Sequence, residues 1–371
     1  MSATVDALVV GGGPAGATLG VLLARAGQRI TIIEKSAGAH DKMCGDFLSY
    51  EAIAYLRGIG IDPAAMGAAA ISRVRLSARH AIGECALPFT GMSLTRRTLD
   101  ERMLGCAEKG GATVLRGRRV QSLSRSGDVW VARFTDGDEV RAAISFVATG
   151  KHDLHGWPRG AGKQNDLVAF KMYFRLAEKR RAALAGYVEL ILFPDGYAGL
   201  ELVEEGAANL CLVVRRSRLR SCGGQWPNVL EHVLSASPHL AGYLQGATAL
   251  LEKPLALSSI PYGFVRSDAR GEVWSVGDQA AVIPSFAGDG ISIALHSAHV
   301  AAEEYLSGCG ANAFQQRLYG QLRRQVSAAT MLSRVMVAAP VLAQGIRLWP
   351  EALRPITRGT RVPQAKLIAA N

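Results

Sequence analysis

Cysteine and long apolar runs are both scarce in this 371-residue chain. The six cysteines form no C-x-x-C pair, so the usual spacing of a structural zinc site is missing and no metal is expected. Their scatter also argues against a disulfide framework. No apolar run reaches the roughly 20 residues that span a bilayer. A strand is predicted almost at the first residue, so we expect no signal peptide and a cytoplasmic protein.

Acidic residues are fewer than basic ones. The chain has 42 lysines and arginines against 31 aspartates and glutamates, a formal net charge of +11. This excess favours contact with an anionic cofactor, an acidic substrate or a membrane surface, although a solvated surface alone explains it. Zinc-finger spacing and basic stripes with interleaved aromatics are absent from the sequence, so no nucleic-acid partner is expected.

An apolar helical stretch near the C-terminus leaves peripheral membrane contact open. It includes Met331, Met336, Leu342 and Ile346 and is interrupted by Pro340. Such a stretch closes a lipophilic pocket, lies on a membrane or packs into the core, and core packing is the favoured interpretation.

A glycine-rich turn directly follows the first apolar strand. Residues 5–10 predict a buried parallel strand, and Gly11-Gly12-Gly13-Pro14-Ala15-Gly16 leads into a helix from 14 to about 26. Gly11 permits a tight turn, Gly13 lets a pyrophosphate approach the backbone, and Gly16 lets the helix pack close to the strand. The helix N-terminus presents free N–H groups and partial positive charge. The motif predicts a dinucleotide site.

An acidic residue ends the next predicted strand. Residues 29–33 form that strand, and Glu34 follows about 20 residues past the glycines. A carboxylate there accepts hydrogen bonds from both hydroxyls of an adenosine ribose, which favours FAD or NAD over NADP. The complete strand–turn–helix–strand–acid unit is far more specific than the glycines alone. The predicted cofactor-binding residues of this unit are Gly11, Gly13, Pro14, Ala15, Gly16, Glu34 and Lys35.

A second glycine-rich signature lies some 260 residues further on. A predicted strand over 272–277 ends in Gly277-Asp278, and Pro284 and Gly288-Asp289-Gly290-Ile291 lead into a helix over about 291–306. Together the two signatures resemble flavoproteins of the para-hydroxybenzoate hydroxylase-like group, which includes geranylgeranyl reductases and flavin-dependent halogenases. The resemblance implies that Asp278 binds a hydroxyl of FAD. It also implies that the loop of Pro284, Gly288, Gly290 and Ile291 lies against the flavin ring.

Three shorter segments carry the same resemblance. Arg96 and Asp100 match an Arg-x-x-x-Asp segment whose arginine usually reaches FAD, and Val120 lies on the strand whose backbone typically meets the adenine. Lys42-Met43-Cys44-Gly45-Asp46-Phe47-Leu48-Ser49 is similar to the Lys-x-Cys-Gly-x-x-x-Ser segment of geranylgeranyl-reductase-like enzymes, which passes near the flavin. The resemblance therefore adds Arg96, Val120, Cys44, Gly45 and Gly150 to the expected cofactor-binding residues.

This chain lacks several sequence motifs of the flavoprotein group, and each missing motif argues against one possible reaction. The Asp-Gly pair of many single-component hydroxylases is replaced by Ala148-Thr149-Gly150-Lys151-His152, which argues against direct nicotinamide use. NAD(P)H and a separate reductase therefore both remain open as electron donors. The tryptophans lack Trp-x-Trp-x-Ile-Pro spacing, so halogenation is not expected. The Tyr-x-Trp-x-Phe-Pro segment of geranylgeranyl reductases is replaced by Gly196-Tyr197-Ala198-Gly199-Leu200-Glu201, which weakens the prenyl-reductase alternative.

Three residues are candidates for the chemistry, and each has a structural alternative. Cys44 is a redox or thiolate partner near the flavin, or a small packing residue. Asp289 relays a proton beside the flavin, or caps the following helix, which is favoured. Tyr197 donates a hydrogen bond toward the flavin, or is an ordinary sheet residue. His296 and His299 share a helix face, but packing is favoured over a metal.

These patterns predict an α/β fold: a Rossmann-type, glutathione-reductase-like FAD-binding domain, an inserted mixed-sheet substrate domain and a helical C-terminus. We assign residues 1–70, 93–165 and 268–310 to the first, 71–92 and 166–267 to the second, and 311–371 to the third. The leading functional expectation is an FAD-dependent monooxygenase of secondary metabolism, in which a flavin hydroperoxide oxygenates an apolar or aromatic polyketide or isoprenoid. A C=C reductase of the geranylgeranyl reductase kind is the alternative, and a non-catalytic flavoprotein is the third option.

Overall fold

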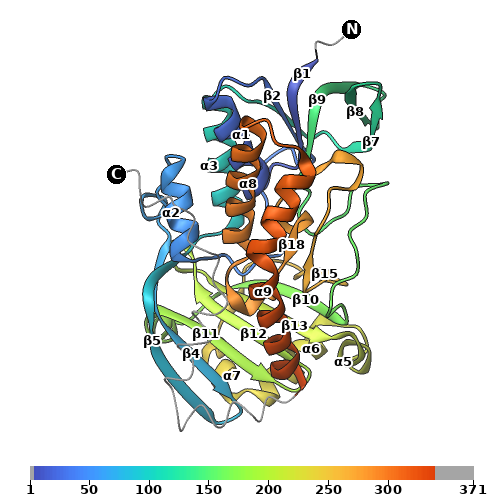
Figure 1. Ribbon diagram of the computed structural model, residues 1–371. Helices are drawn as coiled ribbons and strands as arrows, with labels where there is room; N and C mark the ends of the chain where they lie inside the picture. The colour runs from blue at the N-terminus through green and yellow to red at the C-terminus, as the bar shows by residue number, and fades with distance from the viewer. Residues whose placement is uncertain (1–3, 339–371) are drawn as a thin grey trace.

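A computed structural model describes residues 4–338, and a sheet built around the first strand forms its upper half in Figure 1. β1 (Val5–Val10) pairs in parallel with β2 (Ile30–Glu34) and with β9 (Glu139–Val147). β1 and β2 are near-continuous apolar runs, as strands covered on both faces require. In spatial order the sheet runs β6 (Thr113–Arg116), β2, β1, β9, β8 (Val129–Phe134) and β7 (Val120–Ser126), and β17 (Trp274–Ser275) pairs with β9.

Three helices pack together beside this sheet (Figure 1). They are α1 (Pro14–Arg25), α3 (Arg96–Lys109) and α8 (Gly290–Leu306), and their buried faces share one apolar core with β1 and β2. α2 (Tyr50–Gly58) joins the same core. The first helix is therefore anchored on the sheet with its N-terminus at the glycine turn.

A second, mixed sheet forms the lower half of the molecule in Figure 1. Its β11 pairs in parallel with β4, whereas the other described pairings of this sheet are antiparallel. In spatial order it runs β14 (Thr248–Ala249), β10 (Leu167–Arg175), β13 (Ala208–Arg215), β12 (Gly196–Leu202), β11 (Gly186–Phe193), β4 (Ala69–Ala78), β5 (Ala81–Ser93) and β3 (Phe47–Leu48), and β15 (Leu255–Ser258) pairs with β10.

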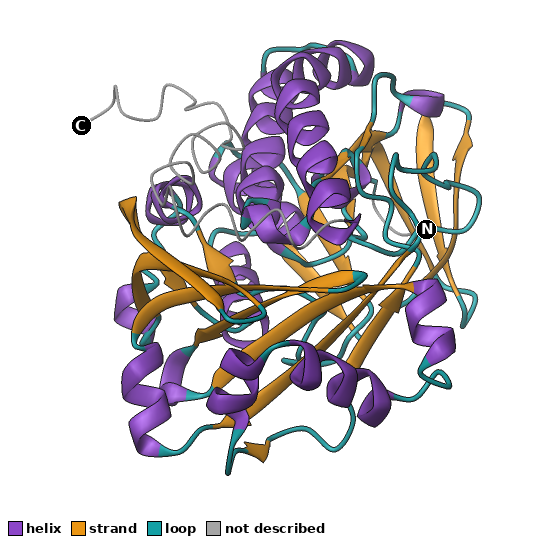
Figure 2. Cartoon of the chain, turned by 90° about the horizontal axis from the view of Figure 1, so that it is seen from below, coloured by secondary structure: helices purple, strands orange, loops and turns teal. Residues whose placement is uncertain are grey.

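The two faces of the second sheet carry different residues because side chains alternate along a strand. Even-numbered residues of β10, such as Phe170 and Met172, pack with α6 (Trp226–Ala236) and α7 (Pro238–Leu244) in one core. Figure 2 shows helices packed against this sheet, seen from below. The shorter helices α4 (Glu178–Leu184) and α5 (Arg216–Ser221) adjoin strands of the same sheet in the chain. Odd-numbered residues such as Lys171 and Tyr173 occupy the opposite face, which meets the first half.

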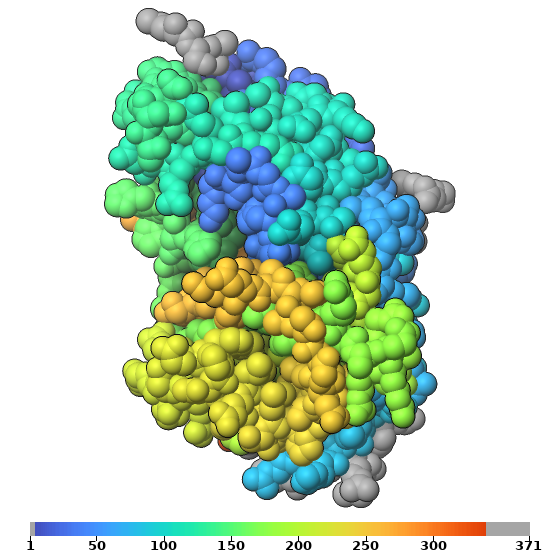
Figure 3. Space-filling view, turned by 180° about the vertical axis from the view of Figure 1, so that it is seen from behind, coloured from blue at the N-terminus to red at the C-terminus, as the bar shows by residue number. Residues whose placement is uncertain are grey.

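The two halves are joined by the remaining elements. α9 (Ala311–Ala338) runs from the first sheet to the second in Figure 1, and Phe314 near its start stacks on Trp274 at 5.2 Å. β16 (Phe264–Val265) pairs with β18 (Ala281–Val282). Figure 3 shows the orange segment around residue 260 lying along the junction between the upper and lower halves. Short 3-10 turns are formed by Ala64–Met66, Glu204–Gly206, Arg270–Glu272, Gly277–Gln279 and Ser285–Ala287.

The predicted α/β fold class is confirmed, but one predicted strand is shorter in the structure. The strand expected over 272–277 is only the two residues of β17, because Gly271 and Gly277 both adopt positive φ and place 3-10 turns on either side. The domain boundaries stay a prediction. Of the apolar C-terminal stretch, Met331 is 69% exposed whereas Val337 is buried, and Pro340, Leu342 and Ile346 lie outside the described residues. Among residues 4–338, no helix is long and apolar enough to cross a membrane.

Candidate FAD site

The turn after β1 is shaped so that a phosphate can reach the backbone. Gly11 has a φ of 111°, and a Cβ there would lie 2.4 Å from the carbonyl oxygen of Ala148. A Cβ on Gly16 would lie 1.9 Å from the carbonyl oxygen of Gly11. At Gly13, by contrast, the nearest atom to a Cβ would be the guanidinium of Arg96 at 3.4 Å. Gly11 and Gly16 therefore close the turn, and Gly13 leaves bare backbone beside a positive charge at the N-terminus of α1.

Arg96 is oriented toward this turn by a buried carboxylate one helical turn away. Its guanidinium makes two hydrogen bonds to Asp100, of 2.6 and 2.7 Å, and Lys42 Nζ lies 2.8 Å from the same carboxylate. Burial opposes ionisation of Asp100, but Arg96 and Lys42 together lower its pKa. The start of α3 is fixed by the Thr95 side chain, which accepts a hydrogen bond from the Thr98 N–H. The arginine is thus held in place before any ligand arrives.

Glu34 lies at the carboxyl end of β2 as an ionised acceptor. It is 6% exposed, and its carboxylate accepts hydrogen bonds from the N–H groups of Gly12 at 2.8 Å and Ser36 at 3.0 Å. Burial alone would raise its pKa, but Lys42 and the two N–H groups lower it. The neighbouring Lys35 is exposed, and Val120 is buried at the start of β7. Glu34 therefore fits the ribose-binding position that the sequence predicts.

The ends of β9 and β17 meet through side chains near Gly150. Lys151 Nζ lies 3.2 Å from Asp278 Oδ2, and Gln279 Nε2 donates to the carbonyl of Gly150 at 2.9 Å. Burial lowers the pKa of Lys151, but the charge of Asp278 outweighs it and the net direction is upward. Asp278 therefore lies at the carboxyl end of the sheet, where ligands of α/β folds bind.

The expected flavin-ring loop is contacted from both halves of the molecule. Gly288 has a φ of 71°, and a Cβ on it would lie 2.7 Å from Cδ1 of Phe47, which belongs to the cysteine-containing segment. From the second sheet, the Tyr197 hydroxyl lies 3.2 Å from Ser285 Oγ, and its ring packs edge-on against Phe286. The loop begins at the buried Pro284, and Gly290 and the buried Ile291 open α8. The structure thus brings the cysteine segment and Tyr197 to one loop.

Asp289 does not have the structural role that the sequence favoured. It is completely buried at the N-cap of α8. Within residues 4–338 its carboxylate makes no capping hydrogen bond to that helix, so the capping interpretation is wrong. A φ of −104° with a ψ of 7° differs from the extended backbone that a capping side chain needs.

Cys44 lies half-buried between charged groups. The backbone N–H of Asp46 donates to its sulfur at 3.5 Å, and the thiol also interacts with the guanidinium of Arg96. The carbonyl of the adjacent Gly45 accepts a hydrogen bond from Asn209 Nδ2 at 3.0 Å. Arg96 therefore lies close both to Cys44 and to the glycine turn after β1. The segment that carries Cys44 is held to the second sheet by the hydrogen bond from Asn209.

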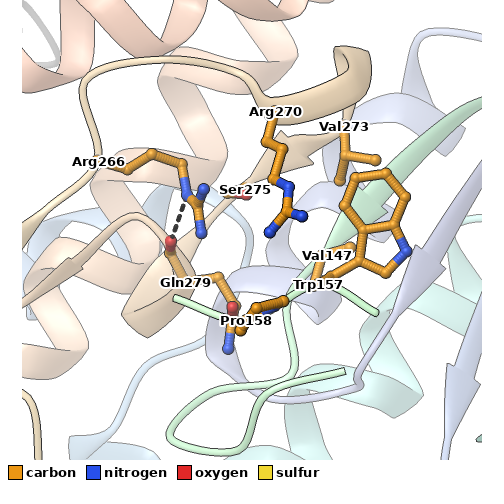
Figure 4. Close-up of a pocket in the computed structure, with 8 residues that line it drawn as sticks. All are labelled: Val147, Trp157, Pro158, Arg266, Arg270, Val273, Ser275 and Gln279. Carbon is orange, nitrogen blue, oxygen red and sulfur yellow. Dashed lines mark hydrogen bonds between the residues drawn. The ribbon is translucent and has the colours of Figure 1, made fainter. Parts of the chain in front are cut away.

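Two other features do not form part of this site. His296 is buried and lies within 2.8 Å of both the Tyr55 hydroxyl and Gln321 Oε1, and residues 4–338 contain no cluster of three possible metal ligands. A separate pocket, drawn in Figure 4, has Arg266, Arg270 and Trp157 in its wall. Its volume of about 10 Å³ holds about one water molecule. It is therefore too small for a flavin or a lipid.

Comparison with known proteins agrees with this arrangement. Residues 4–152 match a family model described as an FAD binding domain. A menaquinone reductase of Mycolicibacterium smegmatis is 27% identical over 326 residues, which cover 83% of this chain and 78% of that protein. Digeranylgeranylglycerophospholipid reductase 2 of Methanopyrus kandleri is 27% identical over 311 residues, 80% and 76% of the two chains. The chain is an FAD-dependent oxidoreductase. The resemblance drawn from its motifs is confirmed.

Solved structures of other flavoproteins share the fold of this FAD-dependent oxidoreductase. The flavin-dependent brominase Bmp2 superposes with a TM-score of 0.79 at 16% identity, covering 96% of this chain and 93% of the brominase. The halogenase PltM in complex with phloroglucinol and FAD gives 0.72 at 14% identity, covering 92% and 77%. At these identities the likeness concerns the fold.

Sequence reasoning missed several residues that the structure places at the site. Lys151 and Lys42 lie in segments that the motifs already quoted, but their partners Asp278 and Asp100 became known only from the fold. Asp46, Lys171 and Tyr173 form a buried group next to Cys44. A lysine inside the otherwise apolar stretch 167–174 was the signal available for this group.

Proposed function

We propose that this oxidoreductase saturates a carbon–carbon double bond of an apolar, isoprenoid-type lipid. The observation that carries the proposal is the position of Cys44, whose thiol interacts with Arg96 and whose segment packs through Phe47 on the expected flavin-ring loop. Bound FAD, once reduced, would supply the alkene with a hydride, that is, one hydrogen nucleus together with two electrons. The second hydrogen must arrive as a proton, and a thiol held beside the loop is suited to donate it.

The relatives support the same class of reaction. Both proteins compared above over about four fifths of this chain are named reductases, and one name specifies a geranylgeranyl lipid. The Lys42–Ser49 segment resembles the corresponding segment of geranylgeranyl-reductase-like enzymes. Its Cys44 is three residues from Phe47, the side chain that lies against Gly288 of the loop.

The apolar side chains that surround the loop favour an apolar substrate. Phe286 of the loop packs with a cluster of buried residues from the second sheet and α9, including Tyr197, Val213, Tyr262 and Met336. A wall of this kind would hold a hydrocarbon chain and exclude water from the reacting atoms.

Hydroxylation of an apolar or aromatic molecule is the competing function, and it stays a prediction. Oxygen transfer places its demands on water exclusion and substrate position, which the same wall would meet. Oxygen transfer includes no step in which the thiol of Cys44 would take part. The two functions therefore differ in their need for oxygen and for Cys44.

The deciding experiment follows product mass under nitrogen and under air. Protein containing FAD is reduced with dithionite and mixed with a polyprenyl quinone or a geranylgeranyl lipid in detergent micelles. We expect a product heavier by two hydrogen atoms under nitrogen. Cys44→Ala should lower its yield by about 100-fold or more at unchanged FAD content, while Cys222→Ala, at the end of α5, should not.

Two results would decide against the proposal, and a change of reductant tests the electron donor. A product that forms only in air and gains one oxygen atom would support the monooxygenase instead. Absence of any reduced lipid, in protein whose flavin bleaches with dithionite, would rule out the isoprenoid reductase. Replacing dithionite with NADH or NADPH tests whether electrons come directly from a nicotinamide or from a separate reductase.

A further inference from the structure

The C-terminal turns of α9 separate a buried apolar surface from an exposed one. Met336 and Val337 face inward and belong to the cluster that packs with Phe286 and forms the proposed substrate wall. Met331 and Val335 face outward, where they are 69% and 41% exposed. Figure 1 shows this red end of α9 beside the second sheet. The helix therefore has water on one side and the substrate wall on the other.

The outward residues form a stripe along one face of the helix. They are spaced three or four residues apart, so they lie above one another, and all are exposed: Ala328, Met331, Val335 and Ala338. Single exposed apolar side chains are normal on a protein surface. Within residues 4–338 the other large hydrophobic residues that are exposed lie on four separate segments: Tyr50, Ile82, Leu250 and Leu306. Among these residues, Met331 and Val335 alone lie one turn apart on a helix.

Basic residues surround this stripe. α9 contains four arginines and no aspartate or glutamate. Arg324 and Arg334 are exposed, and their spacing of seven and three residues from Met331 places them on the same side of the helix. Lys163 adds a third cation, since its Nζ donates to Ser327 Oγ at 2.9 Å. Among residues 4–338, none of these three cations forms an ion pair with a carboxylate.

An anionic lipid surface matches both features of this face. Methionine and valine side chains enter the boundary between headgroups and acyl chains, while arginine and lysine reach the phosphates with their long side chains. The formal net charge of +11 draws the molecule to such a surface. A soluble anion would bind the cations but would leave Met331 in water. The combination of stripe and cations therefore favours a bilayer over a small acidic ligand.

We propose that the outer face of α9, from Arg324 to Ala338, docks on an anionic membrane and places the substrate wall next to it. This rests on the proposed function, since an isoprenoid-type lipid must pass from the bilayer to the loop of Phe286. The stripe and the wall lie on opposite sides of one helix, whose width is about 10 Å. A lipid that leaves the bilayer beside α9 thus reaches the wall after a short path.

The first test needs no catalysis. Protein containing FAD is sedimented with vesicles of phosphatidylglycerol or of phosphatidylcholine at about 50 mM and about 500 mM salt. We expect at least about tenfold stronger binding to phosphatidylglycerol at the lower salt concentration, because each exposed cation near an anionic surface adds to the affinity. The higher salt concentration should remove most of this difference, because salt screens exposed charges.

One pair of variants tests the apolar stripe. Met331→Glu puts a charge into the stripe without removing a buried contact, so the affinity for phosphatidylglycerol vesicles should fall by about tenfold or more. Leu306→Glu is the matched control, because Leu306 is 48% exposed and gains the same charge. It ends α8, before the start of α9, and the helix from Ala311 to Met331 spans about 30 Å. Its affinity should stay within about twofold of the parent value.

A second pair of variants tests the cations. Arg324→Gln combined with Arg334→Gln removes two positive charges from the face, and the affinity should fall by about 10- to 30-fold. Arg102→Gln combined with Lys179→Gln removes the same charge from exposed positions on α3 and α4. This control should lose less than about threefold, because distant charges are screened. Equal losses in the two double variants would show that total charge attracts the membrane, and would overturn the proposal.

The last measurement connects the face to the reaction. A polyprenyl quinone is supplied in phosphatidylglycerol vesicles or in detergent micelles. Met331→Glu should reduce it about tenfold more slowly than the parent in vesicles, and within about twofold of the parent rate in micelles, where no docking is needed. Slowing to the same extent in both would place the effect in the active site and contradict the proposal.

The binding data can also contradict it. Equal binding of the parent to the two kinds of vesicle, or equal losses in Met331→Glu and Leu306→Glu, would overturn the proposal. So would a dimer that dissociates in Met331→Glu, seen by light scattering, because a second copy of the chain would then cover the face. If the parent reduces no alkene, the proposed function fails, while sedimentation still shows whether α9 binds the membrane.

Discussion

Lys151 and Asp278 meet at the carboxyl ends of two paired strands, with 3.2 Å between Nζ and Oδ2. Lys151 follows β9 and Asp278 follows β17, and these strands pair in parallel with Trp274 opposite Phe146. Because ligands of α/β sheets bind beyond the carboxyl ends of the strands, this ion pair lies at the edge where FAD is expected. The lysine compensates the charge of the aspartate.

Removal of the aspartate should therefore weaken FAD binding more than removal of the lysine. Asp278→Ala loses a hydrogen bond to a charged acceptor, worth about 1.5–3 kcal/mol, so the Kd for FAD should rise by about 10- to 100-fold. Lys151→Ala leaves the acceptor in place and should change the Kd by less than about threefold. Fluorescence quenching of FAD titrated into the apoprotein measures both. Equal losses would contradict a direct contact of Asp278 with the cofactor.

Two glycines of the turn after β1 should respond oppositely to alanine. In Gly16→Ala the new Cβ would lie 1.9 Å from the Gly11 carbonyl oxygen, a backbone atom that cannot move aside. We expect a loss of about 3 kcal/mol or more in the free energy of unfolding, measured with urea. In Gly13→Ala the nearest atom would be the Arg96 guanidinium at 3.4 Å, so the apoprotein should keep its stability while FAD binding fails. An unstable Gly13→Ala apoprotein would show that this backbone is not open.

How much the sequence revealed depends on whether the residues of a feature are neighbours in the chain. The turn of Gly11, Gly13 and Gly16 and the acid at Glu34 follow from one strand–helix–strand unit, so their spacing alone placed them. The same holds for the helix after Gly290. The capping role favoured for Asp289 was wrong because it assumed an extended backbone at the N-cap that the loop does not adopt.

Contacts between distant segments could not be predicted in this way. Asp46 and Lys171 are 125 residues apart and meet only because β10 turns its odd-numbered face toward residues 42–46. Tyr197 reaches Ser285 for the same reason, from β12 to the loop before α8. A lone lysine in an apolar strand signals that a buried partner exists, but the partner depends on the strand order.

Glu34 gives a prediction about the adenosine end of the site. Its carboxylate is held by the N–H groups of Gly12 and Ser36 at the end of β2. Glu34→Gln keeps the shape but removes the charge, so affinity for FAD should fall by about 10-fold or more. Glu101→Gln on α3, where the glutamate pairs with Arg116 nearer the surface, should leave it unchanged. Competition titrations with ADP report the same end of the site, and an unaltered ADP affinity in Glu34→Gln would contradict ribose binding.

Stability in mild acid should depend on His299. Burial lowers the pKa of His299 to about 4, and its Nδ1 lies 2.9 Å from the Leu295 carbonyl oxygen, so the ring is neutral in the folded protein. The unfolded chain binds a proton at this histidine below about pH 6.5, whereas the folded chain does so only near pH 4. The contribution of neutral His299 to the free energy of unfolding is therefore fully present above pH 6.5. It falls by about 3 kcal/mol in total as the pH drops toward 4.

His299→Gln should remove this dependence while keeping a donor for the Leu295 carbonyl. Between pH 7 and pH 5 the parent protein should lose about 2 kcal/mol more than the variant in urea unfolding. His155→Gln, in an exposed loop, should follow the parent curve. Parallel curves for the parent and His299→Gln would mean that the folded state accommodates the charged ring. Acid sensitivity would then have to arise elsewhere, first at His296, whose pKa is also lowered by burial one helical turn before His299.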